Sequence, residues 1–245
     1  MSFGRVGFGF RDPIGHAHRP IGFYCPRDRI DHRSTGDVAM TRETGNPKPK
    51  NRLPETRNPK PETIGALTAI VGPDHVITDV SALTQLARTT LPVATMPMAV
   101  VRPADAAQVQ AVVQVARAHG LHLYPYSRGR NWGYGDRNAA RDGAVLIDLG
   151  RMDAIHHVDA ELGYAVIGPG VSQGQLFAHL RDHGLTWRMD CTGAGPDASI
   201  VGCMVERGYG HSRLGDRYAN SAAWQLVLGD GRIVETGRAS CRERV

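Results

Sequence analysis

A strand that runs into a glycine-rich loop is the feature that most constrains what this chain can fold into. Residues 121–136 read LHLYPYSRGRNWGYGD, and the apolar residues of 121–126 favour an extended strand. Gly129, Gly133 and Gly135 permit backbone turns with φ > 0, which point successive N–H groups into one concavity that binds phosphate or pyrophosphate. The spacing fits neither the Rossmann fingerprint nor a Walker A loop, and an ordinary wide connection between strands is the alternative.

The elements around this loop predict where it lies in a sheet. Residues 99–101 predict a short strand, and residues 104–119 predict a helix, because Val109, Val112, Val113 and Ala116 recur at helical spacing before Gly120. Residues 99–126 therefore form a βαβ unit with the glycine loop at the carboxyl end of its second strand. Ligands of α/β sheets bind at that end.

The rest of the chain alternates helices with strands and hairpins, which predicts an α+β fold. Ser172 and Gln175 have capping-box spacing and predict the start of a helix that ends at Gly184. Asp230-Gly231 predicts a two-residue hairpin turn. The other predicted elements are helical segments at 64–71 and 76–90, a buried strand at 144–149, a hairpin of 154–158 with 164–167, a second glycine-rich region at 192–211, and strands at 224–228 and 232–236.

Charge is distributed unevenly along the 245 residues. Residues 1–62 hold 12 Lys and Arg against 7 Asp and Glu, whereas residues 63–245 hold 17 of each. The remainder of the chain thus has no excess positive charge for a nucleic-acid backbone, and we expect no nucleic-acid partner. Residues 1–62 lack a hydrophobic period and are expected to be a disordered or spurious extension. Neither a signal-peptide run nor a membrane-span run is present, so a cytoplasmic protein without a membrane partner is expected.

Metal-binding and nucleophilic patterns are weak. The four cysteines lie far apart without a C-x-x-C pair, which argues against a zinc site and a disulfide scaffold. His179 and His183 are more typical of a solvated helix face than of a metal site. Ser199 lacks the Gly-x-Ser-x-Gly context of a hydrolase and predicts a helix N-cap. We expect no metal, and no catalytic residue can be assigned.

Two glycine-rich regions on separate elements suit one long ligand with a diphosphate in its middle, and FAD is such a ligand. Arg128 and Arg130 have the charge to stabilise a pyrophosphate, although all 17 basic residues after Lys60 are arginines, so codon bias explains their identity equally well. Trp132 either shields the cofactor or packs on the sheet.

Five segments in order carry a family resemblance. They are AVVRPADAAQVQAVVQVARAHGLHLYPYSRGRNWGYG, AVLIDLGRMD, YAVIGPGVSQGQLFAHL, TGAGPDASIVGCMVERGYGHSRLGD and LVLGDGRIVETG. Over residues 64–237 the chain resembles the FAD-binding domain of the vanillyl-alcohol oxidase and p-cresol methylhydroxylase flavoproteins, and especially the branch with 4-cresol dehydrogenase. The resemblance implies a two-subdomain fold: a small βαβ-type subdomain and a second sheet with flanking helices. It places the FAD-binding domain at 63–237, followed by a tail without family likeness at 238–245.

The resemblance also implies which residues bind FAD. Cys203 stands where relatives commonly have Asn, and the first loop lacks the histidine that other branches use for covalent attachment, so the FAD should be dissociable. The implied cofactor residues are Arg128, Gly129, Arg130, Asn131, Trp132 and Gly133 at the pyrophosphate loop, Thr192, Gly193, Ala194, Ser199, Gly202, Cys203, Glu206 and Gly208 along the ribityl and pyrophosphate portion, and Ile233 at the adenine.

The implied function is that of the FAD-binding part of an oxidoreductase. In such an enzyme the flavin takes a hydride from the benzylic carbon of a 4-alkylphenol or aromatic alcohol, and a homodimer or a cytochrome acceptor is the expected further partner. A hydroxy-acid or alditol oxidoreductase of the same fold is one alternative, and a catalytically silent nucleotide-binding fragment is another. The isolated chain is expected to be inactive, since the family's substrate pocket lies largely in other segments.

Overall fold

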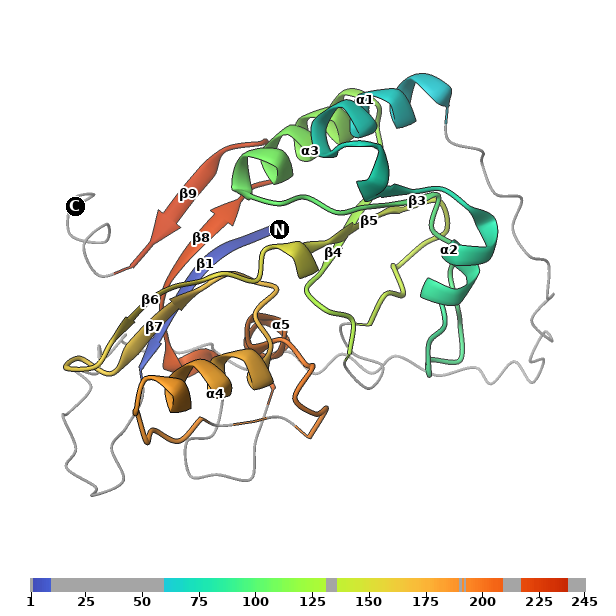
Figure 1. The fold of residues 1–245 in the computed structure, drawn as a ribbon. Coiled ribbons are helices and arrows are strands. Elements are labelled where there is room, and N and C mark those ends of the chain that lie inside the picture. Colours follow the sequence, from blue (N-terminus) through green and yellow to red (C-terminus); the bar gives the residue numbers. More distant parts are fainter. Residues whose placement is uncertain are drawn as a thin grey trace, which may run out of the picture.

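Two β-sheets with their covering helices make up the molecule. The computed structural model describes residues 60–130, 136–189, 191, 193–208 and 217–237, and the backbone of 2–9. One sheet has four strands in the order β2-β3-β5-β4, and the other has five in the order β6-β7-β1-β8-β9. In Figure 1 the two sheets lie side by side, with α1 and α3 above the junction and α4 and α5 beside the five-stranded sheet.

The four-stranded sheet is largely parallel. β3 and β4 each pair in parallel with β5, whereas β2 pairs antiparallel with β3. The predicted βαβ unit is thus confirmed, with β5 inserted between its two strands. The elements of this unit are α1 (Pro61–Val71), the short 3-10 helix η1 (Pro73–His75), β2 (Val76–Ile77), α2 (Val80–Leu86), β3 (Ala99–Val101), α3 (Ala106–Ala118), β4 (Leu123–Tyr126), β5 (Val145–Asp148) and η2 (Leu149–Arg151).

Alternation along its strands divides the apolar residues of this sheet between two faces. Val101 packs with α1 and α3, while the adjacent Val100 packs with Leu83 of α2. On β5, Ile147 and Leu146 divide in the same way. Because successive side chains of a strand point to opposite faces, three buried residues in a row need cover on both sides. The helices provide that cover, and the carboxyl ends of the strands remain available for a site.

The five-stranded sheet is antiparallel throughout. Leu176 and Leu180 of α4 and Val201 and Met204 of α5 pack with Trp224 of β8 in its core. The elements are β1 (Ser2–Gly9), β6 (Ile155–Asp159), β7 (Tyr164–Ile167), α4 (Gln173–Asp182), α5 (Ile200–Val205), η3 (Arg217–Asn220), β8 (Ser221–Val227) and β9 (Ile233–Thr236). Both predicted hairpins, β6 with β7 and β8 with β9, are present.

The strand β1 corrects the prediction that residues 1–62 are disordered. Ser2–Gly9 pairs with β7 on one side and β8 on the other, and α1 already begins at Pro61. A strand between two partners gains backbone hydrogen bonds along both edges, a stabilisation that a search for hydrophobic periods does not detect. The prediction is therefore wrong for 2–9, while residues 10–59 and the predicted tail at 238–245 lie outside the described part of the chain.

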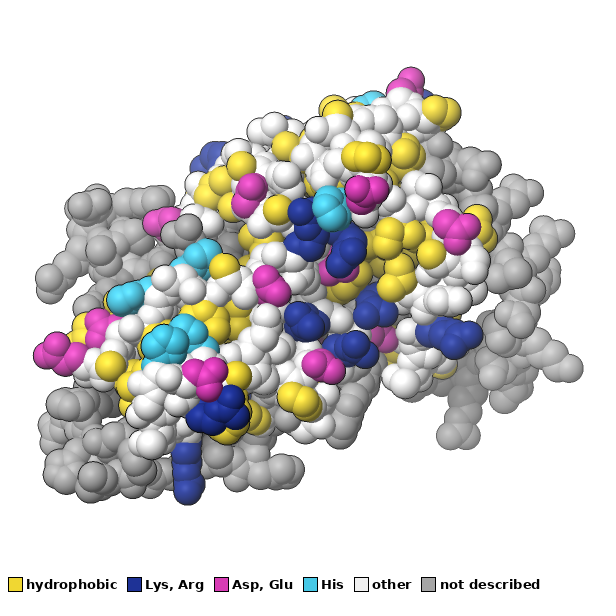
Figure 2. Space-filling view, in the orientation of Figure 1, with side chains coloured by type: hydrophobic (Ala, Val, Ile, Leu, Met, Phe, Trp, Pro, Cys, Tyr) yellow, Lys and Arg dark blue, Asp and Glu magenta, His cyan; other side chains and the backbone are white. Residues whose placement is uncertain are grey.

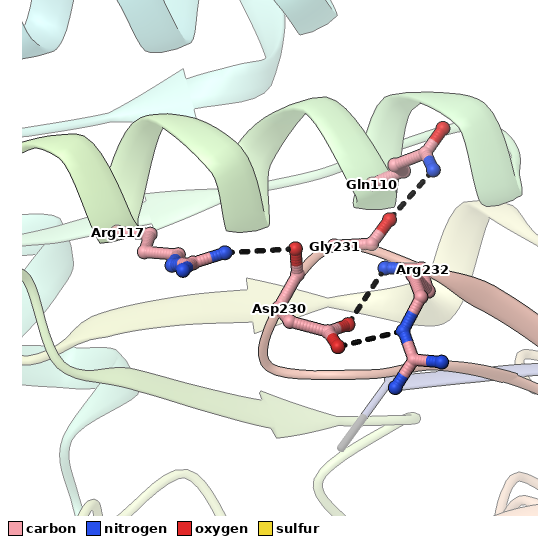
Figure 3. Close-up of polar contacts among 5 residues, drawn as sticks. All are labelled: Gln110, Arg117, Asp230, Gly231 and Arg232. Atoms are coloured by element: carbon pink, nitrogen blue, oxygen red, sulfur yellow. Dashed lines mark hydrogen bonds and ion pairs between the residues drawn. The ribbon is translucent and has the colours of Figure 1, made fainter.

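The hairpin turn between β8 and β9 joins the two sheets. Gln110 of α3 donates from Nε2 to the carbonyl of Gly231 at 2.6 Å, and Arg117 donates from Nη1 to the carbonyl of Asp230 at 3.1 Å. Figure 3 shows both α3 side chains directed at this turn, while Asp230 accepts from Arg232. Gly231 has φ +88, but its N–H donates to the Leu228 carbonyl at 2.9 Å and Leu228 also bonds Arg232, so the loop has three residues, 229–231, closed by a left-handed glycine, and not the two that were predicted. The end of the five-stranded sheet is thereby fixed to a helix of the other unit.

Helix starts follow the predicted capping residues. Ser172 and Gln175 form a complete capping box at α4, and Ser199 accepts from the Gly202 N–H at α5. Asp105 caps α3, so the helix begins at Ala106 rather than at residue 104. The Ser caps matter for function because they fix the polypeptide turns between β7 and α4 and ahead of α5.

Candidate functional site

The carboxyl ends of β4 and β5 form the floor of the candidate site. Asp148 ends β5 and accepts from the Gly150 N–H at 2.8 Å, and Arg102, after β3, approaches its other carboxylate oxygen at 3.4 Å. Tyr126 ends β4 and is buried. Burial, and secondarily the charge of Asp148, raises the pKa of the Tyr126 phenol well above its ordinary value. The phenol is therefore neutral across the physiological pH range.

Arg128, the second residue of the glycine loop, reaches two other segments. Its Nε donates to the carbonyl of Asp197 at 2.9 Å, and its Nη1 donates to the carbonyl of Gly170 at 3.1 Å. Gly170 lies between β7 and α4, and Asp197 lies between α4 and α5. This one side chain thus connects the first glycine loop to the turns that precede both helices of the other unit.

The two glycine-rich regions meet in space, as the sequence predicted for a single shared ligand. A Cβ built on Gly202 would lie 3.3 Å from Ser127 Oγ and 2.5 Å from Ser199 Oγ. Glu206, four residues further on, is close enough to contribute to the raised pKa of Tyr124 on β4, after burial and Asp136. The N-terminal end of α5 therefore packs directly against the start of the first loop.

Gly129 in the first loop is required both by its backbone angle and by its neighbour. Its φ is +59, and a Cβ at this position would lie 2.7 Å from Nε of Arg137. Arg137 donates weakly to the carbonyl of Arg128 at 3.4 Å and lies over the Tyr126 ring at 5.6 Å. Its Nε is buried and has no hydrogen-bond partner among the described residues. A buried cationic donor without a partner, directly beside the loop, fits an anionic ligand.

The exit of the first loop is fixed by a separate set of contacts. Asp136 is buried and accepts a hydrogen bond from the Thr89 hydroxyl. Asn138 accepts from the Thr95 N–H at 2.8 Å and donates to the carbonyl of Val93 at 2.9 Å. The residues paired in these hydrogen bonds are more than 40 positions apart in the sequence. They fix the loop after its glycines, whereas Arg128 fixes it before them.

The far end of the second region is arranged around Arg217, a buried residue of η3. Arg217 donates to the carbonyl of Cys191 at 2.5 Å and to Cys203 Sγ at 3.5 Å. A Cβ on Gly208 would lie 2.1 Å from that sulfur, so only glycine fits. Cys203, a residue that the resemblance assigns to the cofactor site, therefore contacts a buried arginine of its own chain.

Arginines gather at the boundary between the two units. Arg151 donates to the carbonyl of Arg102 at 2.7 Å, and Arg137 donates to the carbonyl of Arg128. The backbones of Gly150 and Gly170 pack closely between these two pairs, since a Cβ built on Gly170 would lie 2.7 Å from the Gly150 carbonyl oxygen. The Gly170 carbonyl in turn accepts from Arg128. Figure 2 shows Lys and Arg side chains concentrated in the middle of one face, over the boundary visible in Figure 1.

The structure brings together most of the predicted cofactor residues that it describes. Arg128, Gly129, Ser199 and Gly202 lie at the contact of the two regions, and Cys203 and Gly208 lie beside Arg217. Arg130, Gly193 and Glu206 are exposed, and Ala194 is half-buried. Asn131, Trp132, Gly133 and Thr192 lie outside the described residues.

Ile233 is the exception, because it lies in β9 directly after the turn that contacts α3 and pairs with Val227 of the other core. Residues that sequence reasoning missed are Arg137, Asp136, Thr89, Gly170 and Arg217. Of these, only Gly170, in Gly-Pro-Gly, carried a local signal.

Two further findings bear on the type of site. Among residues 60–130, 136–189, 193–208 and 217–237, no group of three or more His, Cys, Asp or Glu side chains is placed to hold a metal ion. Within the same part of the chain, no helix has the length and apolarity needed to cross a membrane.

Comparison with known proteins assigns the family. Residues 97–237, more than half of the chain, match the FAD binding domain family, so the protein belongs to that family. The chain is 38% identical over 179 residues to 1'-carboxy-chondrochloren decarboxylase of Chondromyces crocatus, and 30% identical over 172 residues to the flavoprotein subunit of 4-cresol dehydrogenase from Pseudomonas putida. These alignments cover 73% and 69% of this chain and 33% of each relative.

A solved structure agrees with this assignment. Substrate-bound p-cresol methylhydroxylase superposes with a TM-score of 0.70 at 28% identity, covering 73% of this chain and 35% of the other. The fold is therefore that of the p-cresol methylhydroxylase flavoproteins, as the sequence resemblance predicted. The chain spans about a third of the length of these relatives.

FAD is the cofactor of this family, and the residues present fit it. The buried, unpartnered Nε of Arg137 lies beside Gly129, and positions 129, 170 and 202 leave no space for a Cβ. A diphosphate supplies negative charge and acceptor oxygens that suit the unpartnered Arg137 Nε–H, and it needs close approach to backbone N–H groups.

Proposed function

We propose that this chain forms the FAD-binding part of a flavin-dependent oxidoreductase that acts on 4-alkylphenols or related aromatic alcohols. The observation that carries the proposal is the meeting of Ser127 and Arg128 with Gly170, Asp197 and Gly202. It joins the two glycine-rich regions into one surface where the parallel strands end. The similarity to 4-cresol dehydrogenase and p-cresol methylhydroxylase supports the substrate class.

In this proposal the chain's own residues bind and orient the cofactor. Arg130 and Arg137 supply positive charge for the diphosphate, while the α4 and α5 caps keep the turns around Gly170 and Asp197 in place. The flavin, when bound, supplies the hydride acceptor. The substrate pocket is assigned to the two thirds of the relatives that this chain does not span, and a cytochrome is a candidate electron acceptor.

Flavin titration tests the cofactor half of the proposal. The purified chain should quench FAD fluorescence at a stoichiometry of one, and riboflavin, which has no diphosphate, should bind far more weakly. Equal affinity for FAD and riboflavin would contradict a diphosphate site. Adding ADP should compete with FAD, which separates specific binding from adsorption of the flavin ring.

Anaerobic mixing with 4-cresol tests whether this chain binds only the cofactor while the substrate pocket lies elsewhere in the longer protein. The FAD-loaded chain should not be bleached at a useful rate, because holding the donor carbon beside the flavin is worth about 7–11 kcal/mol of the barrier. A longer protein that contains this chain together with the part matching the rest of the relatives should be bleached rapidly. Rapid stoichiometric bleaching of the chain alone would show that it already contains a working substrate pocket.

A second candidate function follows from the relative with 38% identity, which is named a decarboxylase. In that case the whole protein would remove a carboxyl group from a phenolic substrate with the same FAD-binding part. Carbon dioxide release from a 4-carboxymethyl phenol, compared with oxidation of 4-cresol, separates the two reactions.

A further inference from the structure

Arg128 makes a contact that its proposed role as a diphosphate ligand does not explain. The Nε–H and the Nη1 N–H that it uses point away from different sides of the guanidinium, and each donates to a backbone carbonyl of the other unit. Asp197 is 69 residues away and Gly170 is 42 residues away, so neither contact is local. We infer that Arg128 is a positioning residue that clamps the two glycine-rich regions together and thereby shapes the FAD site.

The two acceptors are held rigidly, which makes the clamp specific. The Gly170 N–H donates to the Met152 carbonyl at 2.9 Å, and a Cβ at Gly170 would lie 2.7 Å from the Leu149 carbonyl oxygen. Next to Asp197, the Ala198 N–H donates to the Gly195 carbonyl at 3.1 Å and the Ala198 carbonyl accepts from Gln173 at 2.9 Å. Moving either carbonyl toward a shorter side chain would therefore disturb these neighbouring backbone contacts.

Only arginine satisfies both carbonyls at once. Its rigid, planar guanidinium holds Nε and Nη1 at a fixed spacing and in fixed directions, whereas lysine has a single nitrogen that cannot take both positions at once. Lysine preserves the positive charge, however. The Arg128→Lys substitution therefore separates a clamp, which needs both nitrogens, from a charge that attracts a phosphate.

Arg130 provides the matched control. It lies in the same loop two residues further on and is exposed. In our assignment Arg130 contacts the diphosphate, and its substitution should weaken FAD binding without affecting the connection between the two units. The assignment of Arg130 rests on the proposed function, whereas the clamp can be tested without any cofactor.

Thermal unfolding of the cofactor-free protein is the first measurement. Arg128→Lys should lower the Tm by about 3–6 °C, the shift that loss of a charged hydrogen-bond pair produces in a chain of this size, while Arg130→Lys should leave it unchanged. Hydrogen exchange of the same samples should show faster exchange at residues 168–171 and 195–198 only in Arg128→Lys. Equal Tm and equal exchange in both variants would overturn the clamp.

FAD affinity as a function of salt is the second measurement. Arg130→Gln should weaken binding about tenfold at low salt and much less at high salt, because screening removes the charge interaction. Arg128→Lys should weaken binding by a factor that does not depend on salt. If Arg128→Lys retains wild-type stability and Arg128→Gln shows the salt-dependent loss, Arg128 is a diphosphate ligand and the inference is wrong.

The two proposals fail in different ways. If the wild-type chain does not bind FAD at all, the proposed function fails, but the Tm and exchange data still decide the clamp. If Arg128→Lys does not fold under conditions where Arg130→Lys folds, that result supports the clamp. Arg128→Gln, which keeps one donor, should then be intermediate in stability, and a Gln variant as stable as wild type would contradict it.

Discussion

The two glycine-rich regions reach the same place by different means. The first, after β4, is fixed by side chains that contact distant segments: Arg128 at its start and Asp136 at its exit. The second, around α5, is fixed mostly by its own backbone and by the caps Ser172 and Ser199. In the first, Gly129 has a left-handed backbone and also lies close to Arg137, whereas in the second the two properties are divided: Gly195 has φ +92 with open space around it, and Gly202 and Gly208 permit close approach. A glycine loop in the sequence therefore does not tell which of its two properties the fold uses.

Gly208→Ala should have the largest effect, because a Cβ would lie 2.1 Å from Cys203 Sγ and 2.9 Å from the Cys203 carbonyl oxygen. We expect a loss of about 2–4 kcal/mol in the free energy of unfolding, measured by urea denaturation. Adding Cys203→Ala should restore only part of the lost stability, since that change removes the sulfur but leaves the backbone carbonyl of residue 203 in place. Gly65→Ala, in an exposed turn of α1 with no atom within 4 Å, is the control and should gain up to about 1 kcal/mol.

Gly129→Ala should cost less, and for a different reason. At its φ of +59, an alanine side chain lowers the free energy of unfolding by about 1–2 kcal/mol through backbone strain. Displacing Arg137 lowers it further. Gly120→Ala is a matched control, because Gly120 has φ +65 and open space around it. The difference between the two variants in urea denaturation measures the Arg137 contact alone. Equal losses would show that Arg137 yields freely, and that the first loop depends on its backbone only.

Ser199→Ala and Gly202→Ala should show non-additive effects. Loss of the Ser199 cap costs about 1 kcal/mol, and Gly202→Ala places a methyl group 2.5 Å from the same hydroxyl. The double variant should be more stable than the sum of the two single effects predicts, because removing the hydroxyl also removes the clash. Strict additivity in a double-mutant cycle would contradict the contact that joins the cap to this glycine.

The smallest effect at neutral pH is expected for Tyr126. Its raised pKa means that the unfolded chain loses the phenol proton first as the pH rises, so stability is unaffected below about pH 10 and falls above it. The contribution of this group is about 1.4 kcal/mol per pH unit beyond that point. Tyr126→Phe should reduce the slope of stability against pH between 10 and 11.5. An unchanged slope would show that other groups, such as Tyr124, dominate.

Several parts of the site were predictable from the sequence. The caps Ser172 and Ser199 were read from patterns of two to four residues, and Asp230-Gly231 indicated the last hairpin, although its loop is one residue longer than predicted. The Asp105 cap of α3 was not predicted. The meeting of the two glycine regions was predicted only through the idea of one shared ligand and the family resemblance. The order of strands was not predicted, since β5 separates β3 from β4 although it follows both in the chain.

What the sequence determined by itself was every feature in which a side chain satisfies a backbone group a few residues away. Such bonds close only a few residues of chain, so they cost little chain entropy once the helix or turn forms. The tertiary structure alone decided that β1 lies between β7 and β8, that Thr89 binds Asp136, and that Arg128 contacts Gly170 and Asp197. Those contacts require loops of more than 40 residues to close, and only the cores of the two sheets, once packed, offset that loss of chain entropy.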